Sequence, residues 1–249
     1  MNQITARRFL PLLATLTLTG AAHAAAPTRV VQGTTQLAGV AAKLGQTFTL
    51  GKGSPLNFTL LKAEYSVGRV VIGKTVYFPK AAEKLLVLHF TVHNPQKAEV
   101  RCYWPDLRST AFDAQDRGFS YVQAVAHDGT SESLAVRLKP AEKLNVMTVI
   151  RVPAAGVVPK LMVQREGDGE VLRYDLRGGV QPFAKGLADP TDASGATPLA
   201  QVPTALKTFS PLERFKVRLD EVKFTQEALN GDAPAVGQRY LSAVFTLRR

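Results

Sequence analysis

Apolar and polar residues alternate more regularly between Glu83 and Asn94 than anywhere else in the chain. Four large apolar residues occupy every second position of this stretch: Leu86, Leu88, Phe90 and Val92. An extended chain places all four on one face, and the intervening positions carry a mixed, partly apolar set. Asn94-Pro95 ends the run, because proline cannot donate to a strand ladder. The stretch predicts the central strand of a β-sheet.

Shorter runs of the same kind come before and after this strand. They lie at 46–50, 58–66, 99–104, 108–112, 119–126, 134–138, 144–152, 160–165 and 170–176. Turn residues recur about every 8–14 positions, and no run has the period of an amphipathic helix. This spacing predicts an all-β fold, specifically an immunoglobulin-like antiparallel β-sandwich.

One early strand changes its apolar phase half-way along. Phe58 and Leu60 share one parity. Ala63 and Tyr65 share the other. A slip of one residue would turn the buried face outwards, so we predict a β-bulge near Leu61-Lys62.

The end of the chain repeats this pattern. Residues 216–225 align without a gap on 57–66 and repeat the change of phase. Four positions then match the alternation of the central strand: Leu241, Ala243, Phe245 and Leu247. The copy stops after about two core strands, which are marginally stable by themselves. We therefore predict an incomplete second module, so that either the sequence is a fragment or these strands pair with the first module or another molecule.

These patterns divide the chain into five predicted parts. They are a signal peptide over 1–24, a mature N-terminal segment over 25–45, the immunoglobulin-like sandwich over 46–177, a linker rich in Pro, Gly and Ala over 178–207, and the incomplete second immunoglobulin-like module over 208–249.

The first part has the features of an export signal. Arg7 and Arg8 precede an apolar run that is too short to span a membrane, and a small-residue cleavage site follows at Ala24. Pro11 interrupts the pattern of a twin-arginine signal, so we expect the general secretory route. The sequence therefore predicts an exported protein, periplasmic or extracellular, with no transmembrane segment.

The net charge of the chain bears on the class of partner that it can bind. The formal net charge is +11, and loss of Arg7 and Arg8 with the signal leaves +9. This charge favours anionic surroundings such as wall polymers, although a solvated surface is the commoner meaning of such a charge. The cations are dispersed and lack interleaved aromatic residues, so we expect no specific nucleic-acid partner.

Cys102, the single cysteine, cannot form an internal disulfide, and its alternating position predicts a small buried side chain.

Four features in order carry a resemblance to a known family. They are a strand ending at Glu64-Tyr65, the central stretch 84–94, a turn near 113–118, and the segment 138–153, which opens apolar-x-Pro-Ala-Glu. Together they resemble the DUF4352 family and its immunoglobulin-like relatives among exported bacterial proteins. In that family glycine occupies the position of Ala141, and glycine reaches positive φ far more readily. The resemblance implies an exported immunoglobulin-like module, often within larger envelope proteins, with no shared catalytic residues.

The sequence contains no catalytic or metal-binding motif. Gly-x-Ser-x-Gly, Ser-x-x-Lys and His-Glu-x-x-His patterns are absent. We therefore predict that the protein is not an enzyme and holds neither a cofactor nor a metal. On one strand, His89 and His93 lie roughly 13 Å apart at about 3.3 Å per residue, too far to share a metal. A metal site would need His127 or acidic residues from other strands.

Aromatic residues near predicted strand ends are the candidate binding residues, since sandwich proteins bind through loops and edges. They are Tyr77, Phe78, Tyr103, Phe119 and Tyr121. The alternative for each of them is an ordinary place in the core.

Two functional hypotheses follow. The first is a non-catalytic exported protein that binds or scaffolds a cell-envelope or extracellular partner, either a protein or an anionic polymer, through strand edges or loops. The incomplete C-terminal module would then also allow self-association. The second is a periplasmic small-ligand or metal-binding protein that uses His89, His93 or His127.

Overall fold

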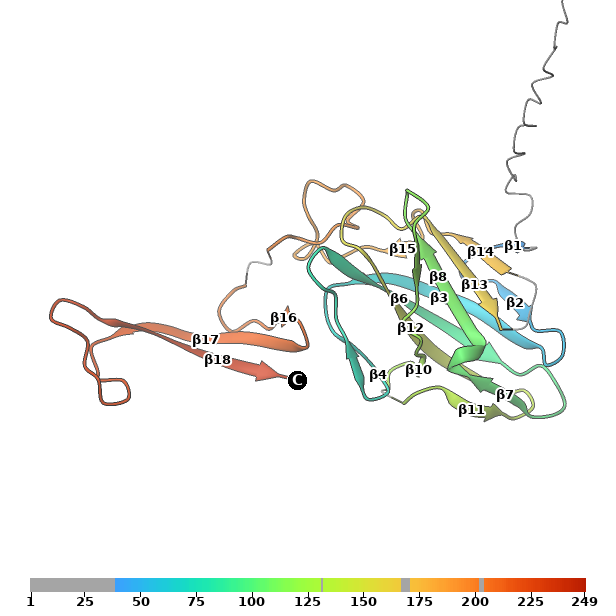
Figure 1. Ribbon diagram of the computed structural model, residues 1–249, viewed down its shortest axis with the longest axis horizontal. Helices are drawn as coiled ribbons and strands as arrows, with labels where there is room; N and C mark the ends of the chain where they lie inside the picture. The colour runs from blue at the N-terminus through green and yellow to red at the C-terminus, as the bar shows by residue number, and fades with distance from the viewer. Residues whose placement is uncertain (1–38, 131, 167–170, 202–203) are drawn as a thin grey trace, which may run out of the picture. The chain divides into compact units, whose positions relative to one another are not determined.

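The computed structural model describes residues 39–130, 132–166, 171–201 and 204–249. Strands account for the regular structure of these residues, apart from one 3-10 turn, η2 (Trp104–Asp106). Two sheets form the layers of a sandwich (Figure 1). The predicted all-β, immunoglobulin-like class is therefore confirmed. The predicted signal peptide lies outside the described residues.

The first layer is built around the predicted central strand, β6 (Glu83–His93). Its order is β10 (Ala126–His127), β12 (Lys143–Pro153), β6, β3 (Leu56–Ser66) and β15 (Val180–Gln181), and β2 (Thr47–Leu50) also pairs with β3. β12, β6 and β3 pair antiparallel over nearly their whole lengths. This layer therefore presents one continuous apolar face to the core.

The second layer covers that face. Its order is β1 (Gly39–Ala42), β14 (Val171–Asp175), β13 (Lys160–Arg165), β8 (Leu107–Phe112) and β9 (Gly118–Ser120). Two small antiparallel pairs complete the fold: β7 (Val100–Tyr103) with β11 (Ala135–Leu138), and β4 (Val70–Ile72) with β5 (Thr75–Tyr77). Cys102 is fully buried in the main core, as its alternating position predicts, and burial raises the pKa of its thiol to about 12.

β6 is buried on both faces. The alternating set that begins at Leu86 lies in the main core. Leu85 and Val87, on the opposite face, pack in a second apolar cluster with Ile72 of β4. The outer face of β6 is therefore partly apolar because the β4–β5 hairpin packs against it.

The predicted bulge is present in β3. The register between β3 and β6 shifts between Leu60 and Lys62, so that Leu61 stands opposite no residue of β6. On either side of the shift, Phe58 and Ala63 both point into the core. The bulge therefore keeps one apolar face through the change of parity.

The folded unit includes residues that we expected outside the sandwich. β1 belongs to the predicted N-terminal segment and pairs parallel with β14. β15 belongs to the predicted linker and pairs parallel with β3, and Phe183 and Ala196 are buried in the main core. The ordered chain thus runs past the expected bounds of 46 and 177, because edge pairing and one aromatic anchor suffice to hold a segment with few apolar residues.

The turn before β12 requires a left-handed backbone at Ala141. Ala141 has a φ of 61°, in the left-handed region that glycine adopts without strain. Its N–H donates to the Asn94 carbonyl at 3.0 Å. Asn94 is fully buried and its side-chain amide lies within 3.1 Å of three backbone carbonyls. The buried Asn94 therefore holds alanine in a glycine conformation.

The C-terminal strands reproduce part of the sandwich. They are β16 (Ser210–Leu212), β17 (Phe215–Thr225) and β18 (Tyr240–Arg248), paired in that order. Corresponding pairs are Leu60–Phe90 with Leu219–Phe245, and Tyr65–Leu86 with Phe224–Leu241. The register shift also recurs, between Leu219 and Glu221. β17 and β18 thus copy β3 and β6 pair by pair, bulge included.

The copy also includes the strand before β3. β16 pairs with β17 as β2 pairs with β3. The N–H of Lys207 donates to Leu219 O at 2.8 Å, and the N–H of Gly45 donates to Leu60 O at the same distance. Both residues have positive φ, 63° at Lys207 and 78° at Gly45. The predicted partial second copy is confirmed, and it starts just before residue 208.

Candidate binding surfaces

The five aromatic residues predicted to bind a partner do not form one surface. Tyr77 and Phe78 lie at the end of β5, Tyr103 ends β7, and Phe119 and Tyr121 lie in and after β9. These strands belong to three different sheets. Tyr121 is buried, and Tyr77 and Phe119 pack partly buried against the apolar clusters. Their role in binding stays a prediction.

Two of these rings already carry a cation. The Arg101 guanidinium lies 3.9 Å from the centroid of the Tyr103 ring, and that of Arg151 lies 5.6 Å from the Tyr77 ring. Cation–π contacts of this kind occupy the ring face that a ligand would use. Phe78 and Phe119 are the other partly exposed aromatic residues of the set.

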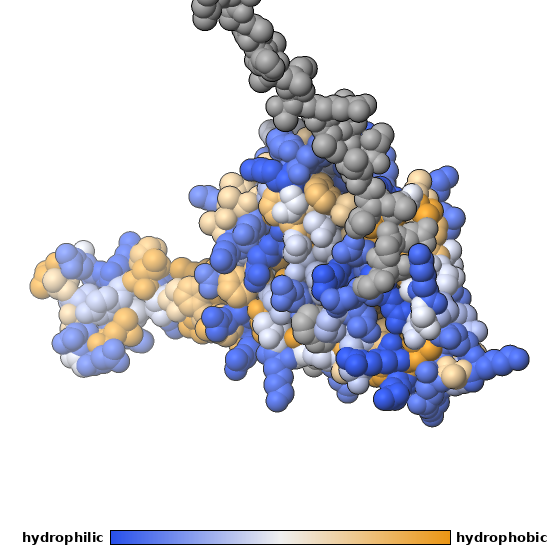
Figure 2. All heavy atoms as spheres, turned by 45° about the vertical axis from the view of Figure 1, so that its right-hand side comes forward, coloured by the Kyte–Doolittle hydropathy of each residue, from blue (hydrophilic) through white to orange (hydrophobic). Residues whose placement is uncertain are grey.

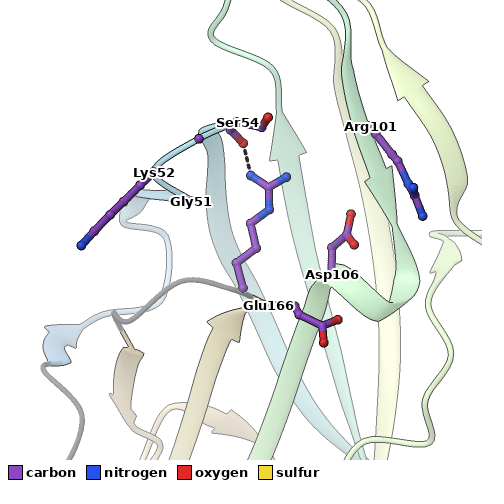
Figure 3. Close-up of a pocket in the computed structure, with 8 residues that line it drawn as sticks. Gly51, Lys52, Ser54, Arg101, Asp106 and Glu166 are labelled. Carbon is purple, nitrogen blue, oxygen red and sulfur yellow. Dashed lines mark hydrogen bonds between the residues drawn. The ribbon is translucent and has the colours of Figure 1, made fainter.

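A polar groove of about 400 Å³ lies at one end of the sandwich. It is lined by Gly51, Lys52, Gly53, Ser54, Arg101, Asp106, Arg165 and Glu166 (Figure 3). Lys52 points away from the carboxylates of Asp106 and Glu166 (Figure 3). The lining includes basic residues such as Arg101 and Arg165 as well as these two acidic residues. The groove therefore does not favour an anionic ligand over a cationic one.

Arg165 explains the shape of this groove. Its side chain is buried, and Nη1 donates to the carbonyl of Leu50 at 3.3 Å and to that of Ser54. Both acceptors flank the turn after β2, so the guanidinium holds that turn in place. Glu166 accepts a hydrogen bond from Arg108 at 2.5 Å. Arg165 and Glu166 thus already have partners within the protein, which indicates a structural role for these two charges.

The histidines of the alternative hypothesis are engaged separately. His89 Nδ1 lies 2.7 Å from Asp128 Oδ2, and Nε2 lies 2.9 Å from Glu64 Oε1. His93 Nδ1 lies 3.2 Å from Asn57 Nδ2. His127 Nε2 is buried and has no hydrogen-bond partner among the described residues. Across those residues, no three His, Cys, Asp or Glu side chains are grouped so as to hold a metal ion.

A buried lysine is the most unusual polar group of the sandwich. Lys84 in β6 is 0% exposed. Its Nζ donates to the carbonyls of Ala154 at 3.0 Å, Ala196 at 2.5 Å and Gly156. The ammonium also lies 4.2 Å from the centroid of the Tyr65 ring. All three of its protons have acceptors, so Lys84 joins strand β6 to two loops that are distant in sequence.

The loop that supplies Ala196 is itself well ordered. Asp192 accepts hydrogen bonds from the hydroxyls of Ser194 at 2.5 Å and Thr197 at 2.6 Å, which hold the pKa of its carboxyl well below the usual range. Thr197 Oγ1 in turn accepts from the N–H of Gly156 at 2.9 Å. Burial lowers the pKa of Lys84 to about 8, and the charge of Asp192 opposes that shift.

The inward-facing surface of β3 and β6 has an uncovered counterpart in the C-terminal sheet. The corresponding residues of the copy are Val217, Leu219, Val222, Phe224, Leu241, Ala243, Phe245 and Leu247, and we call this set the C-terminal apolar face. Phe224 is 63% exposed and Phe245 is 58% exposed. Their counterparts Tyr65 and Phe90 are buried. Apolar side chains are visible at the surface of this sheet (Figure 2).

The copy also repeats the contact between the cation and the ring. Arg239 occupies the position of Lys84, because it stands two residues before Leu241 as Lys84 stands two residues before Leu86, and its guanidinium lies 4.7 Å from the centroid of the Phe224 ring. Among the described residues, this ring contact is the one interaction of the Arg239 side chain. Lys84 is enclosed by backbone carbonyls, whereas its counterpart Arg239 is exposed.

Our sequence reasoning missed Lys84 and Arg239. Lys84 has the same parity as Leu86, so the alternation places it on the inner face of β6. Alignment of the two copies places Arg239 at the same position. The sequence signal that could have identified them is a charged residue at a position whose alternation places it on the apolar face, and this signal occurs in both copies.

No family model matches the chain, and no curated protein matches it either. The resemblance to the DUF4352 family therefore stays a prediction.

Three solved structures resemble part of the chain. An uncharacterised β-sandwich protein from Clostridium difficile is 18% identical, with a TM-score of 0.41, over 56% of this chain and 93% of that one. The secreted protein MPT63 from Mycobacterium tuberculosis is 13% identical, with a TM-score of 0.38, over 53% and 95%. The yjhA protein from Bacillus subtilis is 17% identical, with a TM-score of 0.32, over 48% and 76%. At these TM-scores the fold assignment rests on the topology of the chain itself.

The described residues include no helix that is both long and apolar enough to cross a membrane.

Proposed function

We propose that this chain is a non-catalytic exported β-sandwich protein that binds or scaffolds a cell-envelope or extracellular partner, and that the C-terminal apolar face is its binding element. One observation carries the proposal: β16, β17 and β18 copy strands whose inner face is covered in the sandwich, yet the copied face is exposed. Export rests on the predicted signal peptide of residues 1–24.

The chemistry of this face supports binding in preference to catalysis. Its members are all apolar and lie on one side of an antiparallel pair. Contiguous exposed apolar patches on soluble proteins mark interaction sites. A neighbouring cation, Arg239, lies beside the apolar surface and can pair with a carboxylate or carbonyl of the partner.

The test is capture from solubilised envelope material on the immobilised mature chain, measured by quantitative mass spectrometry. Phe245→Asp places a charge in the C-terminal apolar face, and we expect it to reduce capture of the bound component at least about tenfold, since a buried charge costs several kcal/mol. Val244→Asp is the matched control, because Val244 is the adjacent residue on the opposite face of β18 and is also exposed.

Equal capture by the two variants would show that the face does not bind the partner. The mass of the chain recovered from the producing cells reports in the same experiment whether cleavage occurs after Ala24.

A further inference from the structure

We infer that the occupant of the C-terminal apolar face is a second copy of this chain, with the two faces packed against each other about a two-fold axis. This inference rests on the proposed function, since it names the partner of the same surface. It also specifies what scaffolding would mean here: two sandwiches joined through their C-terminal sheets.

The sandwich itself shows what kind of object covers this face. The equivalent face of β3 and β6 is covered by a second sheet, through residues such as Ala111, Leu161 and Leu172. By this comparison, a second sheet is the kind of partner that fits the C-terminal apolar face. Sheets packed face to face bury alternate side chains of each strand in one apolar layer about 10 Å thick.

The face is complementary to itself. Its paired positions are Val217–Leu247, Leu219–Phe245, Val222–Ala243 and Phe224–Leu241, with no charged residue among them. A two-fold axis brings the same patch of both molecules together, so an uncharged patch meets no unpaired charge. The small Ala243 beside the large Phe245 gives each copy a hollow and a projection. The charged residues of β17, such as Lys216 and Lys223, have the opposite parity and stay in water.

Arg239 supplies a polar contact at the rim. Its counterpart Lys84 is enclosed by carbonyls of covering loops, so this position beside the ring calls for acceptors from whatever lies across it. In a dimer, the backbone carbonyls at a strand end of the second copy can provide them.

Size sets the expected strength. The two long strands β17 and β18, about 30 Å long and about 4.8 Å apart, with the three-residue β16 beside them, give a footprint of roughly 350 Å² per copy, below the roughly 800 Å² per partner of a standard stable interface. The dimer should therefore form and dissociate with concentration.

The test uses the full mature chain in sedimentation velocity from about 1 to about 200 μM, a range that covers micromolar dissociation constants. We expect the dimer fraction of the natural chain and of Val244→Asp to rise together, and Phe245→Asp to stay monomeric. A natural chain that stays monomeric throughout overturns the inference, and so does a dimer that Phe245→Asp leaves intact.

A second measurement does not depend on the folding of a charged variant. Ala243→Cys lies on the apolar face and Ser242→Cys on the opposite one, and Cys102 is buried. Under mild oxidation we expect a disulfide-linked dimer from Ala243→Cys and a monomer from Ser242→Cys. Equal crosslinking of both overturns the face-to-face arrangement.

The two proposals fail in different ways. If the chain is monomeric and Phe245→Asp still reduces capture of an envelope component, the second-copy inference is wrong and the proposed function is supported. A monomeric chain whose capture is unchanged by Phe245→Asp removes both.

Discussion

At the scale of single residues, Lys84 connects sequence and structure most directly. Its parity with Leu86 places it inside the sandwich, where an unpaired ammonium would be very costly. The fold meets that cost with the Tyr65 ring and the carbonyls of two loops. The inward position of Lys84 was therefore predictable from the sequence. The identity of the three acceptors was not, since they lie 70, 72 and 112 residues further along the chain.

The lowered pKa of Lys84 predicts a pH effect on stability. Above pH 10.5 the amine is neutral in both states, and as the pH falls towards 8 only the unfolded chain takes up the proton. Stability contributed by Lys84 is thus lost over this window, by on the order of 3 kcal/mol. We expect the free energy of unfolding of the natural chain, minus that of Lys84→Met, to rise from pH 8 to pH 10.5 in urea titrations.

Lys74, an exposed lysine, provides the control for this measurement. The corresponding difference for Lys74→Met should stay flat. A flat difference for Lys84→Met as well would mean that the lysine is as free to ionise in the fold as in the unfolded chain.

At the scale of elements, the β-bulge decides which residues of β3 are buried. The sequence shows it as a change of parity between Leu60 and Ala63, and the structure confirms it as a register shift at Leu61. The same shift recurs at Asp220, where the carboxylate accepts hydrogen bonds from Arg218 and Thr246, each at 2.5 Å. A bulge was predictable because strand periodicity is local.

Deletion of Leu61 should prevent folding of the sandwich. Without the extra residue, either Phe58 and Leu60 or Ala63 and Tyr65 must face outwards, and each large side chain loses about 1.5–3 kcal/mol of burial. We expect loss of the cooperative thermal transition in near-ultraviolet circular dichroism. Leu61→Ala is the control: its side chain is 46% exposed, so it should cost about 1 kcal/mol or less. A deletion variant that melts like Leu61→Ala would refute the role given to the bulge.

At the scale of the whole molecule, the sandwich uses more of the chain than its composition indicates. The segment 178–207 is rich in Pro, Gly and Ala, which predicted a linker. In the structure it adds β15 to β3, packs Phe183 on the Tyr65 ring with 5.8 Å between centroids, and supplies an acceptor to Lys84. The buried Phe183 ring and the hydrogen bond from Lys84 hold the segment in place. Single contacts of this kind do not alter the average composition of the segment, so composition did not reveal them.

Phe183→Ala should therefore destabilise the sandwich, although it lies in the predicted linker. A buried Phe-to-Ala change costs about 3 kcal/mol or more, and we expect this loss in the free energy of urea unfolding. Lys185→Ala, two residues away and exposed, should remain within about 0.5 kcal/mol of the natural chain. A similar small effect for both would mean that the segment does not contribute to folding.

The sequence was enough to predict most of the strands, the bulge and the second copy, because alternation and parity are properties of neighbouring residues. It did not bring Tyr77, Tyr103 and Tyr121 into one surface, and the structure distributes them over or beside three sheets. Only the tertiary structure decided the parallel edge strands β1 and β15 and the acceptors of Lys84. It also decided that the copied face is exposed while the original is buried. Burial and edge pairing join residues far apart in the chain, so no local pattern contains them.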